Sequence, residues 1–462
     1  MRGVGALDRH VTTEMARWSA ELLDFCRFPS ESTEPAALRD AAAWTADRLG
    51  RLGATVDVIE LPGRPEVPPL VVGEIGDGAG TLNLVQHYDV QPAHPLELWT
   101  TPPYEPAVRD GRLYARGATD NKGELMSRIW GVEAYLATNG ALPCRVRFLV
   151  EGEEETGSPN LGALLDARPD LRRADAALIE GGALDPQDRP IVECGVRGML
   201  AVEIVSRTLG SDVHSSVAPV LENAAARLIA ALATLRDERG ALALDGFLDD
   251  VRTPSEEARA RVRALPTDDL EELRVAYGAK GFLLGREGAD ALEALAFEPT
   301  VNVQAIWAGY SGPGDKNVVP AEARARLDLR LIPDQTPDRV EAALRGHLDR
   351  RGFGDIAFTR MSTSYRPWWT PMDDPLVRAA CAASEAVVGK ESVVSPSAAG
   401  TAPMWEVCSA HDVPTATLGA GRTDSRAHAP DENYRLDDAA TAARITGRFL
   451  DEFAALVEAR GS

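Results

Sequence analysis

Short apolar runs in this chain repeatedly end in an acidic residue or a histidine. In the first 180 residues these runs and their ends are Leu82–Gln86 with His87, Val146–Val150 with Glu151, and Ala174–Ile179 with Glu180. Segments with apolar residues at helical spacing lie before and between them, at 15–28, 36–52 and 122–139. Alternation of strand, polar residue and helix predicts an α/β fold, in which functional groups gather at the carboxyl ends of the strands.

A second pattern begins near Gly195. The sequence there predicts strands at 199–205, 300–308 and 323–332, helices at 221–236 and 338–350, and a charged helical stretch at 242–299 with breaks at two prolines. This order of elements predicts a separate α+β unit inserted into the first domain. We therefore expect a catalytic domain formed by residues 1–194 and 365–462, and an inserted domain at 195–364.

The composition limits which binding partners and which cellular compartment we expect for this chain. The chain has 49 basic and 71 acidic residues, a net charge of −22, which argues against nucleic acid and anionic membranes as partners. We see neither a signal peptide nor an apolar run of roughly 18 residues that would span a membrane. The five cysteines are widely spaced and form no C-x-x-C pair, as expected of reduced thiols in a cytoplasmic protein.

Two histidines and several carboxylates form a candidate ligand set. His87 and Asp89 share one face of an extended segment, so Asp89 can orient the His87 imidazole while the ring binds a metal. Asp120 follows a turn and has two oxygens that can bridge two cations. Taken alone, His87 with Asp89 is a weak signal, and Asp120 is equally well explained as a helix N-cap.

The acidic block at 151–158 is the strongest local signal. Its adjacent carboxylates repel one another at the end of a strand unless cations are near. One of them can bind metal while another takes a proton from water, but spacing alone leaves open which glutamate does which. Glu180 and His428 are ordinary residues individually. The complete set, in this order, is what a hydrolytic centre with two metal ions needs.

Three motifs extend this inference to a family. They are His87-Tyr-Asp-Val-Gln-Pro, Arg116-Gly-Ala-Thr-Asp-Asn-Lys-Gly and Glu153-Glu-Glu-Thr-Gly-Ser. With them, nearly the whole chain resembles the M20 family of di-metal peptidases and amidohydrolases. The resemblance implies a zinc-peptidase-like catalytic domain, with a mixed sheet flanked by helices, and an inserted ferredoxin-like lid domain that forms a homodimer.

The resemblance also implies roles for the candidate residues. His87, Asp120 and Glu180 would hold one divalent ion, and Asp120, Glu155 and His428 the other. Glu154 would be the general base and acid, and Asp89 would orient His87. The bond between Asp120 and Asn121 would be a cis peptide. Zn, Mn and Co all suit such ligands, with Zn favoured.

In the inserted domain the resemblance points to the substrate. His214, in Asp212-Val-His-Ser-Ser, would reach the partner subunit's active site and stabilise the oxyanion. Arg330 would bind the substrate carboxylate, for which bidentate pairing is well suited. Asn317 and the Gly400–Thr401 turn would be further contacts. Asn317 and Thr401 stand where relatives often carry Thr and Ser, which puts the substrate preference in doubt.

The resulting hypothesis is a metal-dependent hydrolase that cleaves a peptide or amide bond beside a free carboxylate, with a dipeptidase favoured. An N-acyl amino acid amidohydrolase has the same metal centre and is the alternative, so the substrate is a small peptide or an N-acyl amino acid. A non-catalytic binding protein on the same fold predicts a lost ligand or base, whereas all six positions are present.

Overall fold

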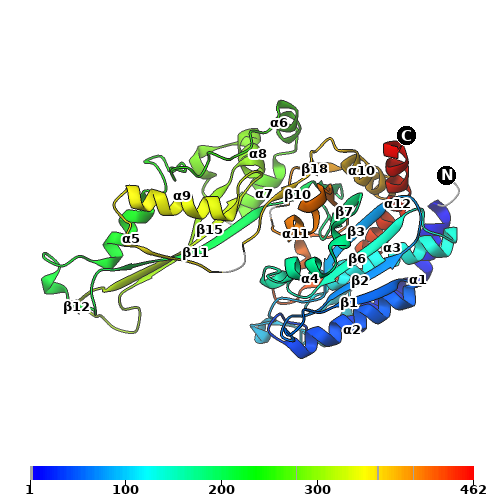
Figure 1. The fold of residues 1–462 in the computed structure, drawn as a ribbon, viewed down its shortest axis with the longest axis horizontal. Coiled ribbons are helices and arrows are strands. Elements are labelled where there is room, and N and C mark those ends of the chain that lie inside the picture. Colours follow the sequence, from blue (N-terminus) through cyan, green and yellow to red (C-terminus); the bar gives the residue numbers. More distant parts are fainter. Residues whose placement is uncertain (1–3, 277, 362–363, 399, 462) are drawn as a thin grey trace. The chain divides into compact units, whose positions relative to one another are not determined.

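The apolar runs that end in His87 and in acidic residues form neighbouring strands of one sheet. In the computed structural model, which describes residues 4–276, 278–361, 364–398 and 400–461, the chain divides into two units. Unit 1 comprises Met1–Val196, Trp369–Ala398 and Ala402–Ser462, and unit 2 comprises Arg197–Trp368 and Ala399–Thr401. Figure 1 shows the elements of each unit.

Unit 1 is built on a six-stranded sheet with the order β1-β2-β6-β3-β7-β19. Its strands are β1 (Thr55–Ile59), β2 (Leu70–Ile75), β3 (Thr81–His87), β6 (Arg145–Glu151), β7 (Ala176–Ile179) and β19 (Thr415–Thr417). β3 pairs in parallel with both β6 and β7, and β19 pairs in parallel with β7. β1 and β2 are antiparallel to their neighbours, so the sheet is mixed and the predicted fold class is confirmed.

Unit 1 also contains long helices, and some of them pack against this sheet. The long helices are α1 (Val4–Phe25), α2 (Pro35–Leu52), α3 (Lys122–Asn139), α10 (Pro375–Val388) and α12 (Leu436–Gly461), with the shorter α4 (Leu161–Ala167) and α11 (Met404–Cys408). α2 contacts β1 and β2, α3 contacts β3, and α10 contacts β19. Trp18 of α1 stacks on Trp130 of α3 with ring centroids 5.4 Å apart, so large buried aromatic surfaces join the helices.

Two small sheets complete the main framework of unit 1. One has the order β20-β5-β4, from β20 (Asn433–Arg435), β5 (Arg112–Tyr114) and β4 (Ala107–Arg109). The other has the order β18-β9-β8, from β18 (Val393–Ser395), β9 (Pro190–Glu193) and β8 (Ala183–Leu184). Because β20 pairs with β5, the segment before Asn433 is brought beside the segment after Tyr114, although the two are far apart in sequence.

Unit 2 contains an antiparallel sheet with the order β13-β15-β11-β16. The strands are β11 (Gly198–Arg207), β13 (Thr300–Ala308), β15 (Glu322–Leu331) and β16 (Ala357–Arg360). Helices α5 (Ala224–Ala233) and α9 (Pro337–Arg350) pack on it, and their buried leucines and valines form one core with the strands. The order β11, α5, β13, β15, α9 is the predicted strand–helix–strand–strand–helix order, and β16 follows it. Unit 2 also contains α6 (Glu256–Arg263), α7 (Asp268–Ala276), α8 (Gly288–Phe297) and a pair of short strands, β12 (Val213–His214) and β14 (Val318–Val319).

Helix α1 and strand β2 are among the elements that differ from the sequence prediction. Helix α1 begins at Val4 rather than near residue 15, because Leu7 and Val11 continue its buried face, and it ends at Phe25, shortly before Pro29. Strand β2 was not predicted, because two prolines precede it and Gly73 lies inside it, and both residue types are unusual in a strand interior.

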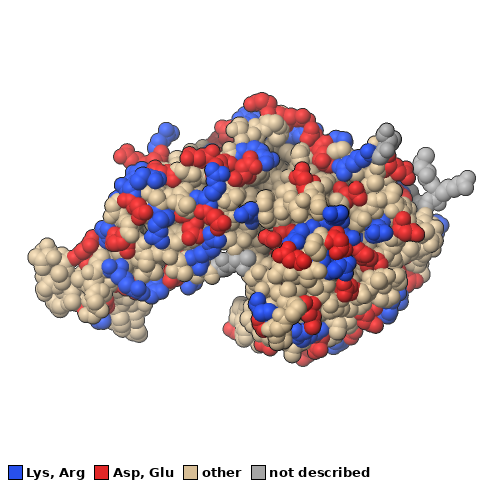
Figure 2. Space-filling model, viewed as in Figure 1, with Lys and Arg blue, Asp and Glu red and all other residues tan. Residues whose placement is uncertain are grey.

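On the face shown in Figure 2, acidic and basic groups are interspersed and are not segregated from each other. Within the described residues, none of the helices combines the length and apolar character needed to cross a membrane.

The core of unit 1 supplies a first prediction. Phe148 on β6 is fully buried between β2 and β3, so Phe148→Ala should lower the free energy of unfolding by about 3–5 kcal/mol. Val58→Ala on the exposed face of β1 should change it by no more than about 0.5 kcal/mol. Urea unfolding measures both values, and equal losses in the two variants would contradict the assigned packing.

Candidate metal centre

The ends of three adjacent strands deliver side chains to one edge of the sheet. His87 is the last residue of β3, Glu180 directly follows β7, and Glu154 and Glu155 begin a short 3₁₀ turn, η2 (Glu154–Thr156), just after β6. The three strands are parallel neighbours, so their carboxyl ends meet at the same place. The strand-end pattern thus accounts for these four residues.

Asp120 and His428 reach the same edge by another route. Asp120 lies just before α3, and His428 lies in the turn that leads into β20. Neither ends a strand of the main sheet, so the strand-end pattern does not account for these two residues. The peptide bond between Asp120 and Asn121 is cis, as the family resemblance implied.

The two oxygens of Asp120 face different histidines. Its Oδ1 lies 3.2 Å from Nε2 of His87, and its Oδ2 lies 2.8 Å from Nε2 of His428. Glu180 approaches the first imidazole, with Oε2 2.9 Å from Nε2 of His87, and Glu155 approaches the second, with Oε2 3.3 Å from Nε2 of His428. All five predicted ligands therefore converge, with Asp120 between the two histidines.

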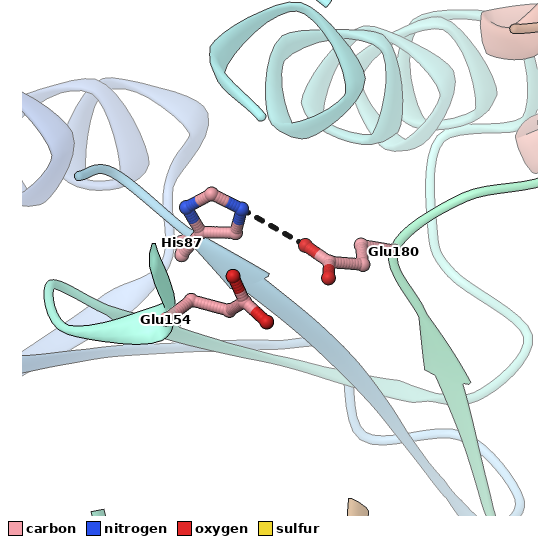
Figure 3. Close-up of side chains that lie close together, drawn as sticks. All are labelled: His87, Glu154 and Glu180. Carbon is pink, nitrogen blue, oxygen red and sulfur yellow. Dashed lines mark ion pairs between the residues drawn. The ribbon is translucent and has the colours of Figure 1, made fainter. Parts of the chain in front are cut away.

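These side chains form two groups with the spacing of metal ligands. Asp120, Glu155 and His428 make one group, and His87, Glu180 and Glu154 make the other, each with its potential ligand atoms within 4.8 Å of one another. Figure 3 shows His87, Glu154 and Glu180 pointing toward one another, with the His87–Glu180 ion pair marked. The first predicted set contained Asp120 in place of Glu154, and both carboxylates are close to His87.

One buried atom indicates that the site suits a cation. Nε2 of His87 is buried and has no partner of hydrogen-bond geometry in the part of the chain that the structure describes. Oxygens of Asp120 and Glu180 nevertheless lie within 3.2 Å of it. Imidazole nitrogen and carboxylate oxygens that face a common point without bonding to each other fit a divalent metal such as zinc.

The charges on the two histidines depend on their carboxylates. Burial on its own lowers the pKa of the His87 imidazole, but the surrounding carboxylates, led by Glu180, raise that pKa well above its ordinary value. Hydrogen bonds with Asp120 and Glu155 raise the pKa of His428 to about 10. Burial acts to raise the pKa of Asp120, but the two histidine nitrogens close to its oxygens outweigh burial and lower that pKa.

The carboxylates of the site nevertheless outnumber its two histidines, so negative charge is in excess there. Burial raises the pKa of Glu154 well above its ordinary value, and the charge of Glu180 raises it further. Burial also raises the pKa of Glu180, against the lowering effect of His87. Carboxylates whose ionised forms are disfavoured by burial and by one another are stabilised by a nearby cation.

Asp89 connects the two halves of the site. It is fully buried, and its Oδ1 lies 3.2 Å from Nδ1 of His87. Its carboxylate also accepts hydrogen bonds from the backbone N–H groups of Glu154 and Glu155, at 3.2 and 3.1 Å, and from the hydroxyl of Ser32 at 3.0 Å. Asp89 therefore lies where it can orient His87, as predicted, and it also anchors the η2 turn, which the sequence did not indicate.

Two further residues hold the ligands in place. Gln91 donates to Glu155 from its backbone N–H at 3.1 Å and from its side-chain amide at 2.8 Å. Glu124 accepts from the N–H of Gly181 at 2.6 Å and from the Asn121 amide at 3.2 Å. Burial raises the pKa of Glu124 to about 7. Neither residue was predicted from the sequence, although each lies within four positions of a predicted ligand or its orienting carboxylate.

The predicted substrate residues lie in unit 2, at two places. His214 pairs with Val318 in the β12–β14 ladder, and the carbonyl of the adjacent Asn317 accepts a hydrogen bond from Ser215 at 3.1 Å. Arg330 lies near the end of β15, opposite Met199. The Gly400 carbonyl accepts a hydrogen bond from the N–H of Arg197 at 3.2 Å, at the start of β11, and Thr401 follows in the chain. Their relation to the metal ligands of unit 1 stays a prediction.

The fold and the site together define a hydrolase with a candidate two-metal centre, and comparison with known proteins places it in a family. Residues 84–452 match Peptidase family M20/M25/M40, and the chain belongs to this family. The human Beta-Ala-His dipeptidase is 31% identical over 365 residues, which cover 76% of this chain and 72% of the relative. The Cys-Gly metallodipeptidase of Saccharomyces cerevisiae is 26% identical over 339 residues, which cover 72% of this chain and 69% of the relative.

Solved structures agree with this assignment. The M20 family metallo-carboxypeptidase from Sulfolobus solfataricus has a TM-score of 0.87 and is 36% identical, with 95% of this chain and 99% of that chain covered. Human carnosine dipeptidase 1 has a TM-score of 0.78 at 26% identity, with 98% of this chain and 99% of that chain covered. The predicted family is thus confirmed.

Asp89 supplies the prediction for this site. Asp89→Asn keeps the shape but replaces one acceptor oxygen with a donor, so it should loosen both His87 and the η2 turn. We expect divalent-metal affinity to fall by roughly 10–100-fold, as is usual when a partner of a ligating histidine is lost. Competition with a chromophoric chelator measures this. Ser32→Ala, which deletes a donor to the same carboxylate, is the control and should have a much smaller effect.

Proposed function

We propose that the chain is a metal-dependent dipeptidase, which hydrolyses a peptide bond next to a free carboxylate. The observation that carries the proposal is the position of Asp120, whose two oxygens face two histidines, each with a glutamate beside it. The names of the relatives support the same reaction, because both curated relatives described above are dipeptidases.

Two divalent ions are part of this proposal. His87, Asp120 and Glu180 would hold one, and Asp120, Glu155 and His428 the other. Zinc is favoured, and manganese or cobalt would suit the same nitrogen and oxygen ligands. When bound, such a pair polarises the scissile carbonyl and lowers the pKa of water.

Glu154 is the proposed general base and acid. It lies in the η2 turn beside His87 and Glu180, and Asp89 anchors its backbone. In the proposed cycle the carboxylate of Glu154 takes a proton from the attacking water and gives it to the leaving amine, the role expected of a positioned carboxylate. A buried surrounding that disfavours its ionised form suits both steps, because Glu154 must hold the proton between them.

Arg330 is the proposed partner of the substrate carboxylate. Its guanidinium makes hydrogen bonds of 3.0 and 3.2 Å to the two oxygens of Asp328, which fixes the plane of its fork. Arginine retains further N–H donors for a second carboxylate. Gly400, Thr401 and Asn317 are proposed as further substrate contacts.

His214 is proposed to act in the partner subunit's site. Strand β15 begins at Glu322, four residues after Val318 of the ladder that carries His214, and reaches Arg330 eight residues later, a span of about 27 Å at roughly 3.4 Å per residue. A dipeptide extends over only about 7 Å. His214 and Arg330 of one chain therefore serve different substrate molecules, and a homodimer allows His214 to stabilise the partner's oxyanion.

An exposed apolar surface of unit 2 supports the homodimer. β13 is an edge strand of the four-stranded sheet, and it exposes Ile306 (53%) and Trp307 (41%), with Tyr310 (48%) just beyond its end. Val220 near β12 is 80% exposed. Figure 2 shows the β12 end of this unit with few charged groups. An unpaired edge with exposed apolar side chains favours isologous pairing with a second copy.

The proposal is tested by a turnover screen. The purified protein, loaded with Zn²⁺ or Mn²⁺, is offered a mixture of dipeptides, tripeptides and N-acyl amino acids, and mass spectrometry follows their loss. We expect selective loss of dipeptides. Loss of N-acyl amino acids alone would overturn the dipeptidase assignment in favour of the amidohydrolase. Stepwise shortening of tripeptides from the carboxyl end would instead indicate a carboxypeptidase, the activity named for the Sulfolobus protein.

Glu154→Gln is the matched control for this screen. It removes the proton acceptor but keeps the side-chain shape, so turnover should fall by roughly 10²–10⁴-fold. Metal content, measured by mass spectrometry of the elements, should stay at the wild-type value. Retained turnover would show that another group is the base.

The dimer gives a separate prediction. Ile306→Lys places a charge on the edge strand and should convert the protein to a monomer in light scattering, with turnover reduced because His214 no longer reaches a partner. Leu98→Lys, at a 62% exposed leucine of unit 1, is the control and should remain dimeric. A monomeric Ile306→Lys protein with full turnover would contradict the role of His214, and a dimeric one would contradict the interface.

A further inference from the structure

The turn that carries Asp120 is folded around one buried carboxylate. Glu432 is fully buried. Its Oε2 accepts hydrogen bonds from Nη1 of Arg116 at 2.7 Å and from the N–H of Gly117 at 2.9 Å. Its Oε1 accepts from the N–H of Thr119 at 2.9 Å and from the N–H of Asp120 itself at 3.0 Å. Four donors of one short segment thus converge on a single side chain.

This arrangement continues a strand ladder. Asn433 on β20 pairs with Tyr114 on β5, and the next backbone bond runs from the N–H of Ala115 to the carbonyl of Glu432 at 3.2 Å. Beyond this bond, the carboxylate of Glu432 accepts hydrogen bonds from the backbone N–H groups of the turn that leads to Asp120, as the carbonyl groups of a neighbouring strand would. The segment before β20 carries His428, so the ladder ties the turns of two proposed metal ligands together.

The His428 turn needs such an anchor. Arg426, His428 and Asp431 all have positive φ, at 59°, 61° and 58°. Non-glycine residues rarely adopt this left-handed conformation, which is unfavourable for each of them. Asp431 is fixed from the other side, because its carboxylate accepts from the N–H and the hydroxyl of Thr100 at 2.9 and 2.8 Å.

The Arg116–Glu432 ion pair is better explained by its effect on the position of the turn than by a contribution to the stability of the fold. Both side chains are almost completely buried, and removing such charges from water offsets much of their attraction. Nη2 of Arg116 donates to the Pro92 carbonyl at 3.2 Å, and its guanidinium lies 5.4 Å from the Trp99 ring. The pair therefore orders a polar turn, and an apolar pair of similar size could not accept the backbone N–H groups of that turn.

We propose that Glu432 is a positioning residue of the metal centre, which holds the Asp120 turn and the His428 turn in register so that both side chains face one ion. The inference rests on the proposed function, because it concerns the proposed ligands. It adds a residue that contacts neither metal nor substrate and acts through Asp120 and His428.

The substitution Glu432→Gln isolates this role. Each carboxylate oxygen of Glu432 faces two N–H donors, so either orientation of the Gln amide places its NH₂ group against two donors. The volume is unchanged, but the turn must move. The matched control is Asp185→Asn, because Asp185 is also buried, accepts from the N–H groups of Gln187 and Arg189, and pairs with the Arg189 guanidinium, none of which is a proposed ligand.

The experiment uses Co²⁺ as the probe with the full-length protein. Wild type, Glu432→Gln and Asp185→Asn are titrated with Co²⁺ in competition with a chelator, and the visible absorption of the bound ion is recorded. In Glu432→Gln we expect at least one ion to bind tenfold or more weakly, with a changed absorption spectrum. In Asp185→Asn we expect a lower melting temperature with affinity and spectrum as in the wild type. A folded Glu432→Gln protein with the affinity and spectrum of the wild type would overturn the proposal.

A second variant covers the case in which Glu432→Gln does not fold. Glu432→Asp keeps the charge but shortens the side chain by one methylene, so it should bind Co²⁺ severalfold more weakly, and unchanged binding would again overturn the inference. Failure of the proposed function gives a different result. If the wild type binds two ions but cleaves no dipeptide, the substrate assignment is wrong and the role of Glu432 stands. If the wild type binds no divalent ion, the metal centre and this inference both fail.

Discussion

Crowding of negative charge at one edge of a β sheet is the constraint on which the rest of this structure depends. The carboxylates that meet there belong to Asp89, Asp120, Glu154, Glu155 and Glu180. Like charges at these distances in a buried site destabilise one another. The imidazoles of His87 and His428 offset part of this charge, and the raised pKa values of both histidines reflect that role. A pair of divalent ions would offset far more, because each carries two charges and binds several oxygens at once.

Four carboxylates in this region divide into two kinds, according to whether or not their oxygens accept hydrogen bonds from backbone N–H groups of the described residues. Asp89 and Glu432 accept from backbone N–H groups, two for the former and three for the latter. Asp120 and Glu180 turn their oxygens toward histidine nitrogens. A carboxylate whose lone pairs are used by N–H donors is suited to hold backbone in place, whereas one that faces an imidazole nitrogen across a short gap is suited to share a cation with it. Asp89 lies two residues after His87, and Glu432 lies four residues after His428, so each proposed histidine ligand has an anchored carboxylate close to it in the chain.

Sequence patterns were sufficient to predict the features that depend on residues close together in the chain. The periodicity of residues 122–139 and 300–308 predicted α3 and β13 with the bounds that the structure has, and the ends of β3, β6 and β7 predicted where His87, the glutamates and Glu180 would gather. The position of Asp120 between the two histidines could be predicted only from the family resemblance. Glu432 could not be predicted, because its contact with Asp120 joins residues 312 positions apart through a ladder of only three residue pairs. A fully buried Arg116 does require a carboxylate partner, but the sequence does not reveal that burial.

The length of β15 has a consequence for the proposed assembly. A strand of ten residues held between two neighbours is stiff, so the distance between its two ends is set by geometry and cannot adapt to a small substrate. If His214 and Arg330 both contact substrate, as proposed, each unit 2 must contribute to two sites, with Arg330 at one end and His214 at the other. Dimerisation would then be part of catalysis rather than an addition to it. β13 runs antiparallel to β15 over most of its length, and its exposed edge lies in the same unit as His214 and Arg330. The surface proposed to join two chains therefore belongs to the sheet whose strand β15 separates His214 from Arg330.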